Sequence, residues 1–494
     1  MTTYISRLRI PLTIVAATLL GLAFLQTTDA QESDPALDDI IGAVDTAWLL
    51  IAAFLVFFMQ AGFAMVEAGF VRAKNTTNIL MKNILDASMG AIAFWAVGWG
   101  IAYGVTGESA PGLFGDGDFF LKGFDDYASW IFQFAFAATA ATIVSGALAE
   151  RTKFTAYLVY SVFITAIIYP VVVHWAWDGN GWMTAFREDT FMANGYIDFA
   201  GSGVVHTVGG IAGLMGAIVV GPRLGKFGKD GSINAIPGHN ISIAVLGMFI
   251  LWFGWYGFNP GSTLGLSGGF AEIAARVAVM TTLAAGAGAA TMAIASKLLS
   301  GKYDMGFVVN GALGGLVAIT APCATVEPWA AIVIGAIGAL VVMAGVRGLE
   351  TLRIDDPVGA VSVHGFAGIW GVLSVGLFSD QDLLLNAYGY EENYGLLLGG
   401  GAEQLAAQAV GIASIIAWTA VTAGVLFLAI RFTIGMRVPE EEELQGLDIG
   451  EHGGEAYPDF SPSAGGGIFG GVSAPAATPS PAAPPIRDTG PAEA

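Results

Sequence analysis

The sequence predicts an all-α protein that crosses a membrane many times. Of its 494 residues, 55% are hydrophobic and only 12% are charged, whereas a soluble domain has about 25% charged residues. The mean hydropathy is +0.66, and the apolar residues gather into eleven segments of a length suited to transmembrane helices. A helix satisfies its own backbone hydrogen bonds inside a bilayer. These observations exclude an ordinary soluble enzyme.

The composition excludes other classes as well. The 40 acidic residues outnumber the 20 basic ones, for a net charge of −20, whereas nucleic-acid binding requires basic surface. Cys323 is the single cysteine, so the chain has no intramolecular disulfide framework and no multi-cysteine metal site. The 69 glycines follow no three-residue period, which excludes collagen. We expect a lipid bilayer around the protein, and no nucleic acid, metal or cofactor bound to it.

The first 30 residues, 1–30, have the pattern of a signal peptide. Arg7 and Arg9 precede an apolar run over 11–25, and the small residue Ala30 comes before a polar stretch. The alternative is an uncleaved first span, but fifteen apolar residues are fewer than the roughly 20 that a bilayer core requires. The sequence therefore predicts cleavage after Ala30.

Residues 31–437 form the predicted membrane domain. Its eleven spans have the approximate edges 44–71, 84–106, 130–149, 154–177, 200–221, 240–259, 270–298, 305–321, 328–346, 358–378 and 404–430. Basic residues gather on the cytoplasmic side of membrane proteins. With the mature N-terminus outside, fourteen basic residues fall on the inner side and only three fall outside, namely Lys122, Arg187 and Arg276. This asymmetry predicts an external N-terminus, a cytoplasmic C-terminus and a multi-pass position in the inner (plasma) membrane of the cell.

The end of the chain divides into two polar parts. Residues 438–460 are acidic and too polar to enter a bilayer. Residues 461–494 are rich in Pro, Ala, Gly and Ser, a composition that cannot form a core, so we expect a disordered tail there.

Two histidines stand in matching settings inside predicted spans. The segment DFAGSGVVHTVGGIAG begins at Asp198 and DPVGAVSVHGFAGIWG begins at Asp356, and seven of their sixteen positions are identical. The matches include the scarce residues Asp and His, so that His206 pairs with His364. The fifth span runs inward and the tenth runs outward. The similarity therefore predicts an inverted repeat of five plus five spans, with an eleventh span appended.

The spacing within the repeat places both histidines deep in the membrane. Each lies eight residues beyond its aspartate, about 12 Å along a helix. Inverted-repeat transporters often hold their substrate sites near the midplane, and an ionisable side chain there points to function. The alternative is a histidine that a backbone carbonyl satisfies within helix packing.

Several ordered motifs resemble the ammonium transporter family (Amt/Mep/Rh), and specifically its bacterial Amt branch. They are GALAER at 146–151, DFAG and VVH within 198–206, WYGFNPGS at 255–262, DDP and VHG within 355–365, and VPEEEE, GLD, HG and AY within 438–457. The resemblance covers the chain from about 44 to 460. It implies an ammonium transporter or channel that assembles as a homotrimer with one pore per subunit.

The resemblance also implies roles for individual residues. The pore residues are His206 and His364, the gate is Phe136 with Phe258, and the ammonium-binding residues are Trp177, Ser262, Phe136 and Asp198. By the predicted orientation alone, the gate and binding residues fall at the outer ends of their spans. An aromatic face attracts a desolvated cation by about 2 kcal/mol. The alternative for the aromatic residues is an interfacial belt.

The chemistry of the pore follows from charge. An unpaired ion is costly in an apolar medium, so NH4+ is expected to lose a proton near the gate and to pass as NH3. Neutral histidines can share one ring proton and offer hydrogen bonds along the path. K+ has no proton to lose and is excluded. The acidic segment 438–460 resembles a regulatory tail that contacts a PII-type signal protein at the cytoplasmic face.

Two residues, Asp198 and Glu67, keep more than one interpretation. Asp198 caps the fifth span, stabilises the incoming cation through space, or accepts its proton, and Asp356 is expected to cap the tenth span. Glu67 is a carboxyl group satisfied by packing or a part of the path by which substrate enters. Some members of the family carry an aspartate where this chain has Gly359, so an inner carboxylate at that position is lacking.

Other functions compete with transport. One is an Amt-like sensor that signals through its cytoplasmic tail, and another is an Rh-like gas channel, although Trp177 and Ser262 favour the Amt branch. An intramembrane enzyme would need a nucleophile or a metal constellation, which two histidines and Cys323 in an outer loop do not supply. We therefore expect no enzymatic activity.

Overall fold

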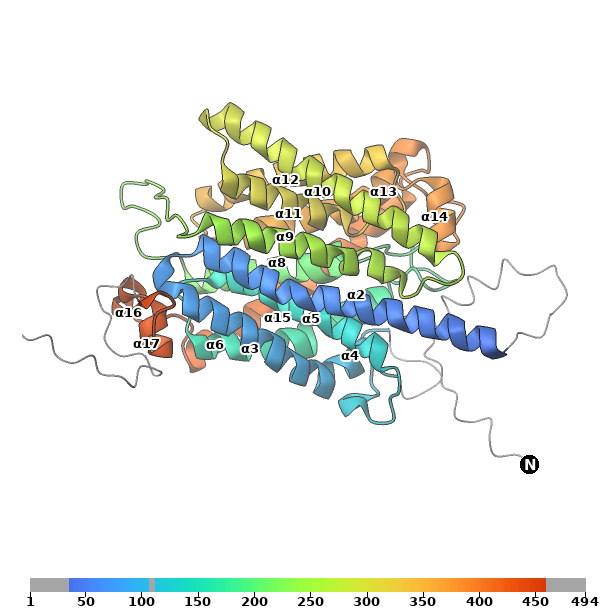
Figure 1. Ribbon diagram of the computed structural model, residues 1–494, viewed down its shortest axis with the longest axis horizontal. Helices are drawn as coiled ribbons and strands as arrows, with labels where there is room; N and C mark the ends of the chain where they lie inside the picture. Colours follow the sequence, from blue (N-terminus) through green and yellow to red (C-terminus); the bar gives the residue numbers. More distant parts are fainter. Residues whose placement is uncertain (1–34, 106–111, 459–494) are drawn as a thin grey trace, which may run out of the picture.

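The computed structural model describes residues 35–105 and 112–458, and the chain forms helices along most of these ranges (Figure 1). Pairing of extended segments within them is limited to three isolated bridges. The all-α prediction is therefore confirmed for this part of the chain. The predicted signal peptide, 1–30, and the predicted tail, 461–494, lie outside the described residues.

Ten helical segments in the described ranges are long and apolar enough to cross a membrane. They are α2 (Pro35–Phe70), η2 to α4 (Ala73–Tyr103), α5 (Tyr127–Leu148), α6 to α7 (Phe154–Trp177), η6 and α8 (Ser202–Val220), α9 and η7 (Ile241–Thr263), α10 (Phe270–Ser300), α12 (Pro328–Thr351), η8 and α13 (Val361–Phe378) and α15 (Glu403–Thr433). Each coincides with one predicted span, so the multi-pass architecture is confirmed.

Several predicted spans differ in length from the helices that the structure shows, and the second, predicted over 84–106, already begins at Ala73. The first helix, α2, begins at Pro35 rather than near 44, because its opening turns are polar and hydropathy does not mark them. α11 (Met305–Ile319), on the eighth predicted span, has only 15 residues, about 22 Å at 1.5 Å per residue. It ends where the chain turns at Thr320, whose carbonyl accepts a hydrogen bond from the Ala200 N–H.

The long helices run side by side along the long axis of the molecule (Figure 1). α2 packs along α9 (Ile241–Phe258), while α10, α11 and α12 pack against one another. α8 (Val208–Val220) contacts α5, α15 and η8 (Val361–Phe366), which brings the two copies of the repeat together. His206 and His364 consequently lie in the interior, with exposed fractions of 0% and 4%.

Both copies of the repeat begin with the same local structure. Gly201 (φ 109°) and Gly359 (φ 80°) take left-handed backbone conformations, which favour glycine. Each precedes a π-helical segment, η6 (Ser202–Thr207) or η8, and each π segment contains the histidine. The sequence predicts an ordinary α-helix at both places, and that expectation is wrong. π-helical turns are rare and concentrate at functional sites.

The aspartates of the repeat cap these segments. The Asp198 carboxylate accepts hydrogen bonds of 2.8–2.9 Å from the backbone N–H groups of Gly201, Ser202, Gly203 and Val204. Asp356 accepts two, from the N–H groups of Ala360 at 3.0 Å and Val361 at 2.9 Å. These bonds satisfy amides that have no partner inside the helix. The capping expected of Asp356 is thereby confirmed, and Asp198 caps its segment as well, which is one of the three roles that the sequence left open for it.

The acidic segment that follows α15 folds onto the ends of the long helices. Its helices α16 (Glu440–Gln445) and α17 (Leu447–His452) lie at the opposite end of the molecule from α14 (Gln381–Tyr388) (Figure 1). The Asp448 carboxylate accepts hydrogen bonds from two backbone N–H groups at the start of α3 (Thr76–Ala93), while the Asn75 side chain accepts one from the Leu447 N–H. The two segments therefore cap each other.

Candidate functional site

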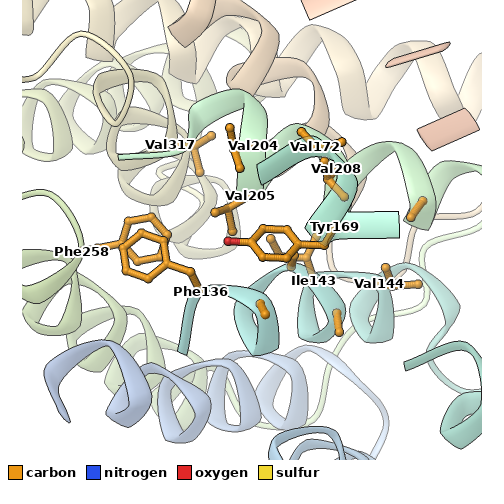
Figure 2. Packing of buried hydrophobic residues seen from close by; sticks show 14 of the residues in the cluster. Phe136, Ile143, Val144, Tyr169, Val172, Val204, Val205, Val208, Phe258 and Val317 are labelled. Atoms are coloured by element: carbon orange, nitrogen blue, oxygen red, sulfur yellow. The ribbon is translucent and has the colours of Figure 1, made fainter. Parts of the chain in front are cut away.

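Two phenylalanine rings close the interior of the helix bundle. Phe136 of α5 and Phe258 at the end of α9 stack with ring centroids 4.0 Å apart and planes inclined by 24°. Both side chains are fully buried, and Figure 2 shows the rings overlapping near Val205 of η6. Rings in such contact leave no room for a hydrated ion between them.

A half-buried aromatic and a hydroxyl group adjoin the gate. The Trp177 ring, at the end of α7 (Tyr169–Trp177), meets Phe136 edge to face, with centroids 6.0 Å apart. The Ser262 hydroxyl donates a 2.8 Å hydrogen bond to the carbonyl of Phe258, which leaves its oxygen free to accept another. Both residues are only partly buried. An aromatic face and a hydroxyl acceptor together suit a small hydrogen-bonding cation.

The geometry distinguishes Trp177 from the other tryptophans of the segment HWAWDGNGW. Trp175 donates its indole N–H to the carbonyl of Leu113 at 2.8 Å, and its ring packs against Trp182. Trp177 instead donates to the backbone carbonyl of Asp198 at 2.8 Å and turns its ring toward Phe136. Among the tryptophans of this segment, Trp177 is therefore the one whose ring contacts Phe136.

The two histidines contact each other beyond the gate. Their Nδ1 atoms lie 3.2 Å apart and their ring centroids 5.2 Å apart. His206 stacks on Phe258 at 5.3 Å, whereas His364 lies beside Phe63 at 5.9 Å. The order of side chains is therefore gate, His206, then His364.

The contact between the Nδ1 atoms sets what the pair can do with protons. One Nδ1 donates to the other, so a neutral pair carries a single shared proton between the rings. The donor ring then has a bare Nε2, and the acceptor ring carries its proton on Nε2. The pair thus offers an acceptor on one ring and a donor on the other. Nε2 of His206 is buried and has no hydrogen-bond partner within the described part of the chain.

Asp198 positions both the indole of Trp177 and the start of η6. Its carboxylate holds the start of η6, and its carbonyl holds the indole of Trp177. Burial raises the pKa of Asp198, and the backbone N–H groups that it binds counter part of that effect. Oδ1 already accepts two hydrogen bonds, and Oδ2 accepts three, the third from the Tyr196 hydroxyl at 3.4 Å. The geometry therefore favours capping over direct acceptance of a proton from the substrate.

Trp255 belongs to the site although the sequence assigned it no role. Its ring stacks on His206 with centroids 5.1 Å apart, and its indole N–H donates to the Thr320 hydroxyl at 2.9 Å. Trp255 precedes Phe258 by three residues, so the two lie on one face of α9. That spacing within WYGFNPGS was the available signal.

Acidic residues of two motifs form ion pairs with arginine side chains and so link the helix ends near the C-terminal segment. Glu150, from GALAER, binds the Arg72 side chain at 2.8 Å and Arg223 at 3.0 Å. Arg223 in turn makes a two-point contact with Asp355, at 2.8 and 3.0 Å. Burial opposes ionisation of Asp355, but the hydrogen bonds from Arg223 and the charges of Arg151 and Arg223 outweigh it and hold its pKa at about 2.

Metal ligation has no visible basis in the part of the chain described. Within residues 35–105 and 112–458, no three His, Cys, Asp or Glu side chains gather in a way that could hold a metal ion. Glu150, Asp198, Asp355 and Asp356 are instead engaged in the hydrogen bonds and ion pairs described above.

Comparison with known proteins gives consistent matches over most of the chain. The model of the Ammonium Transporter Family matches residues 47–457. Ammonium transporter Amt2 of Archaeoglobus fulgidus is 48% identical over 84% of this chain and 89% of its own length. Ammonium transporter 1 member 1 of Oryza sativa subsp. japonica is 46% identical over 85% and 86%. A solved structure named Sensor Amt Protein is 36% identical, with a TM-score of 0.74 over 84% of this chain and 100% of that one.

Proposed function

The chain belongs to the ammonium transporter family, and we propose that it recruits NH4+ at an outer mouth, deprotonates it at the gate and conducts NH3 through the twin-histidine pore. One observation carries the proposal. Ring contacts run without a break through Trp177, Phe136, Phe258, His206 and His364. The series begins at a half-buried aromatic face and ends at two enclosed imidazoles.

The physical chemistry along this series favours ammonia over ions. At the outer end, Trp177 and the Ser262 oxygen replace part of the water around NH4+. Beyond the gate, His206 is fully buried and apolar rings surround it, so an unpaired charge is strongly disfavoured there. NH3 has no net charge and still forms hydrogen bonds with the imidazoles. K+ keeps its charge and is rejected.

The orientation and assembly belong to the same proposal. The distribution of basic residues supports an N-terminus outside and a C-terminus inside, with eleven spans arranged as an inverted repeat of five plus five and one more. We further propose a homotrimer in the inner (plasma) membrane, with one pore per subunit. Exposed apolar side chains such as Phe249 and Phe253 on α9 are available to lipid or to a neighbouring subunit.

Sensing is the second candidate function. It is supported by the similarity to a structure named Sensor Amt Protein and by the docked acidic segment, whose α17 caps α3. That segment offers a surface for a PII-type signal protein on the cytoplasmic side. A sensor of this kind would bind ammonium and alter the docking of the segment without sustained uptake.

Uptake of labelled methylammonium into cells that lack their own ammonium transporters tests the proposed function. The wild type should accumulate label, and the double variant His206→Ala/His364→Ala should lose uptake roughly tenfold or more, the effect of about 1.4 kcal/mol. His239→Ala serves as the matched control. That histidine lies between α8 and α9 and binds the Val71 carbonyl and the Tyr457 hydroxyl.

The outcomes separate the candidates. Normal selective uptake by the double histidine variant would refute the pore assignment. A wild-type protein that reaches the membrane and binds ammonium, but accumulates no label, would favour the sensor.

A further inference from the structure

A buried carboxyl group lies beyond the twin histidines, on the side away from the gate. Glu67 of α2 and His364 line the same cavity, whose other walls include Phe63, Leu251 and Leu313. The part of this cavity that the centre of a water molecule can occupy has a volume of about 20 Å³. That is space for a single water. Glu67 is 3% exposed. One water can therefore connect the imidazole with the carboxyl group.

The surroundings of Glu67 contain an unbalanced set of charges. The Ser145 hydroxyl of α5 donates to Glu67 at 2.7 Å, and Lys82 and Asp86 of α3 are its charged neighbours. Lys82 is fully buried, and its Nζ has no hydrogen-bond partner in the described part of the chain. Glu67 thus has one ammonium group and one further carboxyl group as charged neighbours, so ionisation of all three would leave a net negative charge among them.

That imbalance makes one proton exchangeable. An uncompensated buried charge is costly, and such a group takes up a proton instead. Asp86 accepts hydrogen bonds from two hydroxyl groups, those of Thr142 and Ser161, whereas Glu67 accepts one, from Ser145. Hydrogen bonds to a carboxylate favour its charged form. The exchangeable proton therefore belongs on Glu67, the carboxyl group that lines the cavity.

We propose that Glu67 is the inner proton-transfer group of the pore, so that the proton removed from NH4+ crosses the membrane and transport carries net charge. This inference rests on the proposed function. A proton enters at Nε2 of His206, the shared proton shifts between the two Nδ1 atoms, and the N–H bond at Nε2 of His364 breaks. Its electron pair stays on that nitrogen, while the proton passes through the cavity water to form the O–H bond of Glu67.

The cycle closes when Glu67 releases the same proton to the inner side and becomes a carboxylate again. The transfer leaves the histidine pair neutral but in the opposite tautomer, with a proton on Nε2 of His206 and none on Nε2 of His364. The pair regains its first tautomer when an NH3 molecule in the pore accepts the Nε2 proton of His206 and gives a proton to Nε2 of His364, while the shared proton shifts back between the two Nδ1 atoms. One NH3 and one proton have then crossed. No bond to carbon changes, and no other reactant is needed.

Electrical and optical measurements on proteoliposomes of the full chain test the route. Ammonium is added outside, charge movement is recorded on a solid-supported membrane, and an enclosed dye reports the internal pH. The wild type should give an inward current with little alkalinisation, because proton and NH3 enter together. Glu67→Gln should lower the current roughly tenfold or more. NH3 should still enter and alkalinise the interior beyond protein-free liposomes.

Two further variants serve as controls. Glu67→Asp keeps a carboxyl group and should retain a current well above that of Glu67→Gln. Asp86→Glu keeps the charges of the same buried cluster and alters only the length of a side chain that does not line the cavity. It should therefore keep the wild-type ratio of current to alkalinisation.

Several results would overturn the proposal. A wild-type current in Glu67→Gln would do so, as would an equal loss of current in Asp86→Glu, or loss of both current and alkalinisation in a folded Glu67→Gln protein. Wild-type uptake without any current would refute the proton route but leave the proposed function standing, whereas no uptake refutes the proposed function itself. If Glu67→Gln fails to fold, Ser145→Ala decides, because an unchanged current there contradicts the route.

Discussion

At the scale of single residues, the adjacent residues Asp355 and Asp356 have different structural roles. Asp356 caps η8 through the N–H groups of Ala360 and Val361. Burial raises its pKa to about 6, with the charge of Asp355 adding to that effect. Asp355 points to Arg223 and is held ionised. Adjacent residues of one type thus have opposite pKa shifts because only one of them faces a guanidinium group.

The ion pair of Asp355 leads to a prediction about pH. Because its pKa falls from 3.8 to about 2 on folding, Asp355 stabilises the folded state by about 2 kcal/mol above its unfolded pKa. That contribution is lost as pH falls from about 4 through about 2. Thermal unfolding in detergent should show Asp355→Asn less stable than the wild type by a constant margin between pH 5 and 7.

The difference in stability between the wild type and Asp355→Asn should become smaller below about pH 4, where the wild-type carboxyl group also becomes neutral. A margin that stays constant down to pH 3 would contradict the assigned ion pair. Asp382→Asn is a suitable control, because Asp382 is exposed and makes no ion pair in the described structure.

At the scale of elements, each copy of the repeat packs its glycine on the π segment of the other. A Cβ at Gly210 of α8 would lie 2.1 Å from the backbone nitrogen of Gly365 in η8. A Cβ at Gly368 of α13 would lie 2.5 Å from the Ser202 carbonyl in η6. Helix backbones can approach this closely only where side chains are missing. This mutual contact brings His206 to His364.

A pair of alanine substitutions tests this packing. Gly210→Ala should destabilise the protein by about 3 kcal/mol, because its methyl group would meet backbone that cannot give way. Gly365→Ala on the facing segment should be tolerated, because its Cβ would have no neighbour closer than 3.4 Å. Thermal unfolding and methylammonium uptake of both variants provide the measurement. Equal stability of the two variants would refute the asymmetry of the contact.

At the scale of the whole molecule, the orientation in the membrane is testable by labelling. Cys323 is fully buried, and burial raises the pKa of its thiol well above the usual range. The native protein should therefore react little with a membrane-impermeant maleimide. Glu391→Cys, in an exposed loop after α14, should react in intact cells. Lys302→Cys, in the exposed loop between α10 and α11, should react only after permeabilisation.

The reverse pattern of labelling would show that the chain is inserted with its N-terminus inside. Reaction of both positions in intact cells would place the two loops on one side, which is incompatible with an odd number of crossings between them. The three spans predicted between Lys302 and Glu391 require opposite sides.

The position of the C-terminal segment also depends on contacts with residues that are distant in the chain. Polarity and acidity predicted that residues 438–460 stay out of the bilayer. In the structure Glu443 accepts a hydrogen bond from the Leu224 N–H at 2.7 Å and forms an ion pair with Arg437 at 2.6 Å. Asp448 caps α3. The segment is thus attached to α3 and to the loop after α8, which a charge count cannot reveal.

The sequence by itself determined the class of protein, the positions of the spans, the repeat around His206 and His364 and the candidate gate. Those features follow from local composition and from motifs read along the chain, because burying a span in lipid depends mainly on its own side chains. The capping role of Asp198 was also open to prediction, since a cap lies within one turn of the amides it binds.

Only the tertiary structure decided how these parts meet. The π segments, the contact of the histidines 158 residues apart, the ring of Trp255 on His206 and the cavity shared by Glu67 and His364 depend on helices distant in the chain. Such contacts depend on close packing between backbones, above all at Gly210. A one-dimensional pattern of hydropathy carries no information about which helix faces which.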